Sequence, residues 1–440
     1  MPQRERVVVT GTGAISALGE DARSQWEVVL RGESGVTVLD SLAEQISFPP
    51  DAGQPIAAGR VRGLDPTEWI ADKKALRAMR LHSHMAFAAT DHALASAKLH
   101  SSNVNFDSTG IMLAVPMIDY DIADLDHAAR RSRNEVNEFD IEKFCRSGRQ
   151  AISPMLSIVM LNNATLCQIA MQYQLRGPNA SFSPFGEAGG QAIGEALRVL
   201  QDGDAPVMLA GGVSPRLNLS ALQRIAYLNI LAETSTPAAT SCRPFDRDRT
   251  GTVPGEGAAM LVLETLSHAR SRGAHIFAEV LGHGAAVGVT DEPEPYPSSA
   301  AIAAALASAL DDAETATDRL DCIYADAPGL PCGDAREADA ILAVLGEQAP
   351  TVAVTSTKGA TGHMLAAALP LQCIFAAYGF TDRQVPPVTN LRYPDSDIKL
   401  DLVQSSPRPI GSGAITACLA AGFQGQSECV VLGEFDPRGA

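Results

Sequence analysis

The sequence is short of positive charge. Its 440 residues include 34 lysines and arginines against 51 aspartates and glutamates, which gives a formal net charge of −17. Nucleic acids and anionic membrane surfaces bind positively charged protein faces. We therefore expect neither a nucleic-acid partner nor a membrane partner.

The cysteines show no paired spacing. They stand at positions 145, 167, 242, 322, 332, 373, 418 and 429. Without a C-x-x-C pair or a regular pattern, neither a metal site nor a disulfide framework is predicted. The sequence also has no apolar signal region after Met1 and no run approaching eighteen apolar residues. These absences favour a soluble protein in the reducing cytoplasm.

A cofactor signature is also missing. Residues 7–10 read as a buried strand, followed by a predicted tight turn with glycines at 11 and 13. The third glycine of a dinucleotide fingerprint would fall on Ser16, so the turn is better explained by close backbone packing. No nucleotide, flavin or other cofactor is predicted.

The length exceeds that of a usual single core, which predicts two domains or two fused halves. Strand-like segments at 205–212 and 255–264 precede a basic helical connector at 265–274, and further strands are expected at 322–326, 351–355 and 429–432. Helices are expected within 70–99 and at 364–378, and residues 118–150 are expected to run over the surface. We place the division between residues 1–265 and 266–440.

The most informative stretch is residues 181–194, where a short extended segment turns sharply into a helix through small residues. Apolar residues then recur at three-to-four spacing, so a helix with one buried face should begin near Glu187. Unpaired amides and partial positive charge at a helix start suit a nucleophile or a bound anion. However, Gly186 occupies the turn itself, where no Cys, Ser or Thr stands.

Five stretches, spread in order over nearly the whole chain, resemble the β-ketoacyl-acyl-carrier-protein synthases. They lie at residues 7–13, from 177–178 to the turn, at 243–257, at 356–363 and at 385–391. The resemblance implies a thiolase-like α/β fold, layered α-β-α-β-α and made of two similar halves. It also implies an acyl-carrying Cys at the turn and two His residues that stabilise an enolate.

Residue by residue, the family's chemistry is only partly present. Ungapped counting places Gly186 at the position of the nucleophilic Cys, and a register slipped by one would place Glu187 there. Asp326 stands at the first His, while His363 and Lys358 match the second His and the family's lysine. An ionised Asp would repel an enolate. Cys167 is interpreted as a small buried hydrophobe and not as a replacement nucleophile.

The resemblance also places substrate-binding residues. Ala421 falls where the family has a gating aromatic, beside Phe423 in the loop, and Thr355 and Thr357 flank the second small-residue turn. A lost gate fits a chain that carries no acyl-enzyme. Lys358 and His363 are open to two interpretations, either catalysis or a buried hydrogen-bond network that holds the fold.

One branch of the family has these features: the chain-length factor of type II polyketide synthases, whose turn often reads Gln-Ala-Gly-Gly. We expect the chain to pair with an active ketosynthase, through a large apolar interface around the strand before the turn, and to receive chains from an acyl carrier protein. Since such carriers are acidic, docking would need a local basic patch, either Arg130, Arg131 and Arg133 or Arg77 and Arg80. The alternative is an enzyme of changed chemistry, a decarboxylase, dehydratase or cyclase, using Asp326, Glu187, Lys358 and His363.

Overall fold

The computed structural model describes residues 4–39, 55–100, 102–118, 120–183, 185–288 and 295–437. Within these residues the main strands join in the order β12-β10-β9-β14-β15-β8-β1-β7-β6-β4-β5. The N-terminal half contributes β1 (Val7–Ser16), β4 (Thr109–Ala114), β5 (Asn179–Phe182), β6 (Val207–Val213) and β7 (Gly257–Thr265). The C-terminal half contributes β8 (Ala278–Val287), β9 (Cys322–Tyr324), β10 (Ala353–Thr355), β14 (Ile415–Ala421) and β15 (Gln426–Gly433), with β12 (Asp401–Leu402) at its edge.

The two halves repeat one topology. Taken in chain order within each half, the five main strands lie third, second, fourth, fifth, first. In both halves the third, second and fourth strands are parallel, and the fifth is antiparallel to its two neighbours. The halves join where β1 pairs with β8, Val7 lying opposite Val280. The predicted construction from two similar halves is confirmed.

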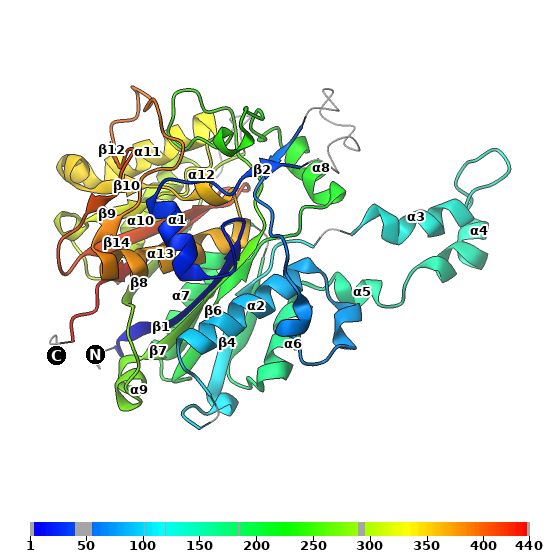
Figure 1. The fold of residues 1–440 in the computed structure, drawn as a ribbon, viewed down its shortest axis with the longest axis horizontal. Coiled ribbons are helices and arrows are strands. Elements are labelled where there is room, and N and C mark those ends of the chain that lie inside the picture. Colours follow the sequence, from blue (N-terminus) through cyan, green and yellow to red (C-terminus); the bar gives the residue numbers. More distant parts are fainter. Residues whose placement is uncertain are drawn as a thin grey trace.

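Helices form three layers around these strands (Figure 1). At the centre, α7 (Ala188–Gln201) and α13 (Ala368–Asp382) contact each other and strands of both halves. The outer layer of the N-terminal half is α2 (Leu81–Ser96) with α6 (Asn162–Tyr173), and that of the C-terminal half is α10 (Ser299–Asp312) with α11 (Pro331–Leu345). The predicted α-β-α-β-α layering is therefore confirmed.

The remaining elements are short or peripheral. They are α1 (Ala22–Leu30), α3 (Ile122–Arg131), α4 (Ile141–Lys143), α5 (Leu156–Val159), α8 (Leu219–Tyr227), α9 (Leu266–Ser271), α12 (Lys358–Thr361), β2 (Thr37–Val38), β3 (Ala57–Ala58), β11 (Gln384–Val385) and β13 (Arg408–Pro409). One stretch of the described chain, Leu365–Asp382, is long and apolar enough to cross a membrane. Because 89% of it is buried inside the fold, it serves as the core helix α13 with its preceding turn.

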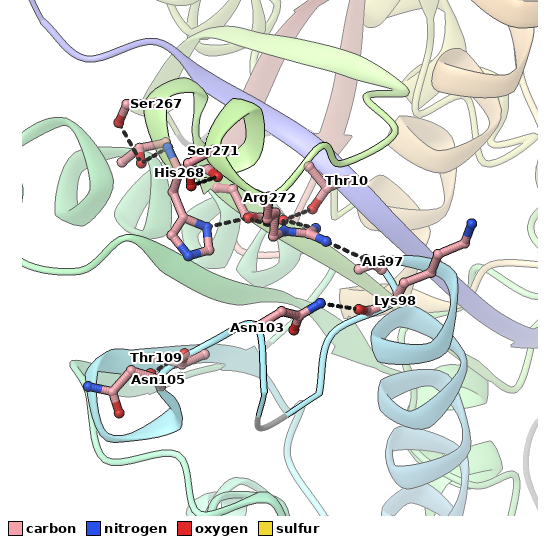
Figure 2. Close-up of polar contacts among 12 residues, drawn as sticks. Thr10, Ala97, Lys98, Asn103, Asn105, Thr109, Ser267, His268, Ser271 and Arg272 are labelled. Carbon is pink, nitrogen blue, oxygen red and sulfur yellow. Dashed lines mark hydrogen bonds and ion pairs between the residues drawn. The ribbon is translucent and has the colours of Figure 1, made fainter.

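The connector between the halves is held by one buried carboxylate. β7 ends at Thr265 and α9 begins at Leu266, so the expected helical connector is present. Glu264 accepts hydrogen bonds from Thr10 Oγ1, from His268 Nδ1 at 2.5 Å and from Arg272. Arg272 also donates to the carbonyl of Ala97 (Figure 2). Burial raises the pKa of Glu264, but these bonds outweigh burial and lower it to about 2. The division of the chain at this point stays a prediction.

Two local expectations were wrong, and a third was confirmed only in part. The predicted turn at Gly11 and Gly13 is instead a continuation of β1 to Ser16. A Cβ at Gly11 or Gly13 would lie 2.4 or 2.0 Å from a backbone oxygen of α2, so these glycines permit close packing without a turn. Within 70–99, only residues from Leu81 on form a long helix. Cys167 is exposed on α6, not buried, because it lies on the outward face of that helix.

Residues 120–150, predicted to run over the surface, do not lie flat on it, and neither do residues 151–161. Their helices α3, α4 and α5 form an arm that projects away from the layered body (Figure 1). Large hydrophobic side chains are exposed along the arm: Tyr120, Ile122, Val136, Phe139, Ile141, Ile158 and Leu161. Apolar groups in such number on one projection are typical of a surface that a partner covers.

Candidate active site

The predicted turn lies between β5 and α7. α7 begins at Ala188, one residue after Glu187, as expected from the apolar spacing. A Cβ built on Gly186 would lie 3.4 Å from His363 Cε1 and 2.6 Å from the Ala421 carbonyl oxygen. Position 186 therefore faces the imidazole of His363, and the end of β14 leaves no room there for a side chain.

Asp326 and Lys358 form a buried ion pair. Lys358 Nζ donates to Asp326 Oδ1 and to the Asp326 carbonyl oxygen, each at 2.5 Å, and both side chains are 1% exposed. The second carboxylate oxygen of Asp326 accepts a hydrogen bond from the Tyr296 hydroxyl at 3.0 Å. Both oxygens of Asp326 are thus occupied by groups of the protein itself.

A second buried carboxylate, that of Glu337, holds the backbone next to this ion pair. Glu337 on α11 accepts the backbone N–H groups of Asp326 and Ala327, each at 2.7 Å. Burial, followed by the negative charge of Asp326, raises the pKa of Glu337 to about 8. Tyr296 and Glu337 were not predicted from the sequence, since they lie 30 and 11 residues from Asp326 and carry no motif.

His363 is a neutral hydrogen-bond donor. Its Nδ1 accepts the backbone N–H of Leu365 at 3.1 Å, which places the proton on Nε2. Burial lowers the pKa of His363 to about 3, and the charge of Lys358 adds to this effect. Nε2 is buried and has no hydrogen-bond partner. It could donate to a carbonyl oxygen brought beside the turn.

Glu187 is the second unpartnered group. The residue is fully buried, and among the described residues neither carboxylate oxygen has a hydrogen-bond partner. Burial raises the pKa of Glu187 to about 7; the backbone N–H groups of Glu187 and Phe185 lower it in part, and the nearby carboxylates of Glu428 and Asp326 raise it further. The four predicted polar residues therefore form two groups. Asp326 and Lys358 are paired with each other, whereas the carboxylate oxygens of Glu187 and Nε2 of His363 have no hydrogen-bond partner among the described residues.

Of the four predicted substrate-binding residues, two lie at the turn and two do not. Phe423 packs its ring against His363 at 5.5 Å and against Phe185 at 6.0 Å, and Ala421 abuts Gly186. Thr355 instead donates to the carbonyl of Pro386 at 2.8 Å, and Thr357 caps the short helix α12 with its backbone. These two threonines therefore stabilise the small-residue turn between β10 and α12.

An apolar pocket opens beside the turn between β5 and α7, which we call the elbow. It is lined by Phe185, Phe423, Leu365, Pro116, Met117, Pro215, Ala221, Arg224, Ile225 and Leu228. The cavity measures about 20 Å³, close to the volume that holds a single water. It runs toward Met117, which is 51% exposed. An acyl chain would enter it only if these side chains move.

No described thiol offers a nucleophile at the turn. The Cys242 thiol donates a hydrogen bond to the carbonyl oxygen of Pro328, with 3.8 Å between sulfur and oxygen, and burial raises the pKa of this thiol to about 12. Such a thiol remains protonated at neutral pH. Over the described ranges, no three His, Cys, Asp or Glu side chains are grouped so as to hold a metal ion.

The layered fold with paired halves and a strand-to-helix elbow at the centre defines a thiolase-like ketosynthase architecture. Residues 4–269 match the N-terminal domain of the beta-ketoacyl synthases, and residues 277–392 match their C-terminal domain. The chain belongs to the beta-ketoacyl synthase family.

Relatives agree along the full length. The chain is 29% identical to 3-oxoacyl-[acyl-carrier-protein] synthase 2 of Staphylococcus aureus (strain N315), covering 99% of this chain and 100% of the relative. It is 30% identical to the protein of the same name from Coxiella burnetii, covering 98% and 99%.

Solved structures add a second kind of neighbour. The ishigamide ketosynthase/chain length factor is similar at a TM-score of 0.83 and 27% identity, covering 99% of this chain and 100% of that one. A type II polyketide-synthase ketosynthase, in complex with its acyl-carrier protein and bound to the hexaketide, is similar at 0.84 and 25%, covering 98% and 100%.

Proposed function

We propose that this chain is a chain-length-factor-like subunit of a type II polyketide synthase. It pairs with a ketosynthase that bears the cysteine nucleophile, and it shapes the pocket for carrier-bound polyketide or polyene chains. The observation that carries this proposal is Gly186: the position facing His363 holds no side chain, and the Ala421 carbonyl closes the space. We take Gly186 to occupy the place of the family's nucleophile.

The ion pair of Asp326 supports the loss of condensing chemistry. Where the family has a neutral histidine, this chain has a carboxylate whose two oxygens are bonded to Lys358 and Tyr296. It neither donates a hydrogen bond to an enolate nor accepts a proton without breaking these contacts. The pair instead joins α12 to the loop after β9, and we assign it a structural role.

The strand before the elbow supplies the partner surface in this proposal. β5 is the last strand of the sheet, so one side of its backbone has no neighbouring strand among the described residues. An unpaired edge is a ready site for pairing with another chain. The apolar arm of residues 120–161 begins near the same edge, since Val115 before it and Asn162 after it are hydrogen-bonded to Phe182 and Ser183. Together the edge and the arm offer an extended surface to a second subunit.

The carrier protein is the other expected partner. Within the predicted basic patches, Arg130 is paired with Asp126 at 2.7 Å and Arg80 with Asp124 at 3.1 Å. Their charge is therefore partly neutralised, which weakens both patches as docking sites for an acidic carrier. We expect the paired ketosynthase to provide much of the docking surface.

Co-expression with a cysteine-bearing ketosynthase tests the proposal. The two chains should purify together, with the mass of a one-to-one heterodimer. Val136 and Ile141 on the arm are 71% and 62% exposed, so V136E/I141E should weaken pairing by about 100-fold, because carboxylates are placed in an apolar interface. The matched control is Val287→Glu, at a site that is 74% exposed on β8. A stable homodimer that elongates carrier-bound substrates by itself would refute the proposal.

The alternative is a ketosynthase-fold enzyme with changed chemistry, such as a decarboxylase, dehydratase or cyclase acting on a carrier-bound chain. The observation in its favour is that the carboxylate oxygens of Glu187 and Nε2 of His363 are buried and have no hydrogen-bond partner among the described residues. A carboxyl with a pKa near 7 and a neutral imidazole donor could serve general acid–base work. Turnover by the isolated chain, lost in Glu187→Gln and in His363→Gln, would favour this reading over the first.

A further inference from the structure

A second set of buried polar side chains lies under the first turns of α7. Glu428 on β15 and His283 on β8 form a hydrogen bond, with 2.5 Å between Glu428 Oε2 and His283 Nε2. They are 2% and 7% exposed. α7 carries glycines where it crosses this pair: a Cβ at Gly190 would lie 2.7 Å from Glu428 Cβ, and one at Gly194 would lie 2.4 Å from the His283 ring. The helix is thus fitted directly over the pair.

Glu187 points toward the hairpin that joins β14 to β15. A Cβ built on Gly422 would lie 2.3 Å from Glu187 Oε2 and 2.7 Å from Gln426 Oε1, so these two oxygens are at most 5.0 Å apart. Both are buried and neither has a hydrogen-bond partner. Two such acceptors facing each other repel when the carboxyl is ionised, whereas one proton between them makes a hydrogen bond.

Burial is the main reason for Glu187 to hold that proton; the backbone N–H groups of Glu187 and Phe185 oppose it, and two neighbouring carboxylates add to it. Glu428 faces it from β15, Asp326 from the loop after β9, and both are carboxylates. The cations and histidines on the packed elements are His283 on β8, which is bonded to Glu428, and Lys358 and His363 on and after α12. Lys358 is paired with Asp326 and His283 with Glu428, so each already has a carboxylate partner other than Glu187.

We propose that Glu187, Gln426 and the Glu428–His283 pair form one acid site under the elbow. In it Glu187 is a protonated carboxylic acid that donates its O–H to Gln426 Oε1, and Glu428 is the positioning residue that keeps the proton in place. This inference concerns the interior of this chain and does not depend on the proposed pairing with a ketosynthase.

The acid site would set the shape of the elbow pocket. The Glu187–Gln426 hydrogen bond ties the start of α7 to the hairpin loop that carries Phe423. The ring of Phe423 forms the wall of the pocket and contacts His363 and Phe185. The protonation state of Glu187 therefore affects the position of Phe423, which lines the pocket. Glu187 itself does not contact a chain in the pocket.

Infrared difference spectra of the purified full-length protein between pH 5 and 9 test the inference. We expect the carbonyl stretch of a buried carboxylic acid that disappears with a midpoint near pH 7 and is absent in Glu187→Gln. In Glu428→Gln the midpoint should fall by at least one pH unit, a tenfold loss of proton affinity, because a neighbouring negative charge is removed. The matched control Glu347→Gln, at an exposed site in the short helical turn that follows α11, should leave the midpoint unchanged.

The fold of each variant is checked by its circular dichroism spectrum. Should Glu428→Gln fail to fold, His283→Gln provides the second variant: it removes the donor that screens Glu428, so the midpoint should rise. A wild-type spectrum with no band sensitive to Glu187→Gln would overturn the inference, as would a midpoint that neither Glu428→Gln nor His283→Gln moves.

Discussion

Replacing Glu187 by glutamine should make the stability of the protein less dependent on pH. The side chain is fully buried, and burial raises its pKa from an ordinary value of 4.5 to about 7. Because the folded state holds the proton more tightly than the unfolded state, this carboxyl favours folding fully below pH 4.5 and loses that contribution as pH rises to 7. A difference of about 2.5 pH units corresponds to about 3 kcal/mol.

Glutamine keeps the shape of the protonated acid and has no proton to lose. The free energy of unfolding of Glu187→Gln, relative to the wild type, should therefore increase by about 3 kcal/mol between pH 4.5 and pH 8. Urea unfolding followed by the fluorescence of the two tryptophans, Trp26 and Trp69, measures this difference at each pH. A difference that stays constant with pH would refute the reasoning, because Glu187 would then titrate alike in both states.

Three further substitutions test other parts of the structure. Asp326→Ala should lower the free energy of unfolding by about 3–5 kcal/mol, since it leaves the Lys358 ammonium buried and unpaired, and adding Lys358→Met should recover much of the loss in urea unfolding. Glu264→Gln should cost about 3 kcal/mol at pH 7 and progressively less as pH falls from 4.5 toward 2, because the folded-state pKa of Glu264 is lowered to about 2; a loss independent of pH would contradict this. Gly186→Cys should lower the free energy of unfolding by about 1–3 kcal/mol in the same assay, because its Cβ would lie 2.6 Å from the Ala421 carbonyl oxygen. Unchanged stability would contradict this, since the end of β14 would then move to admit the side chain at no cost.

Much of the architecture could be predicted from local pattern. The apolar spacing after Glu187 placed the start of α7 within one residue, and the repeated order of strand, small-residue turn and helix indicated two similar halves. The predicted turn at the glycines of β1 is wrong because glycine serves both turns and close packing. Only the position of α2 against the strand distinguishes these uses.

The interior of the site was harder to foresee. Asp326, Lys358 and His363 stand in motifs, but their partner Tyr296 does not, and Glu428 lies 145 residues from His283. Such pairs form only after distant segments of the chain have been brought side by side, so no local periodicity indicates them. The same holds for the small size of the pocket, which depends on Phe185 and Phe423 meeting across the elbow.

The central claim is that this chain shapes an elongation pocket without carrying the growing chain. The most direct test is the intact mass of both subunits after the purified heterodimer is incubated with acyl-carrier thioesters. The account predicts that the cysteine-bearing ketosynthase gains the mass of the acyl group while this chain gains none. An acyl group covalently attached to this chain would contradict it.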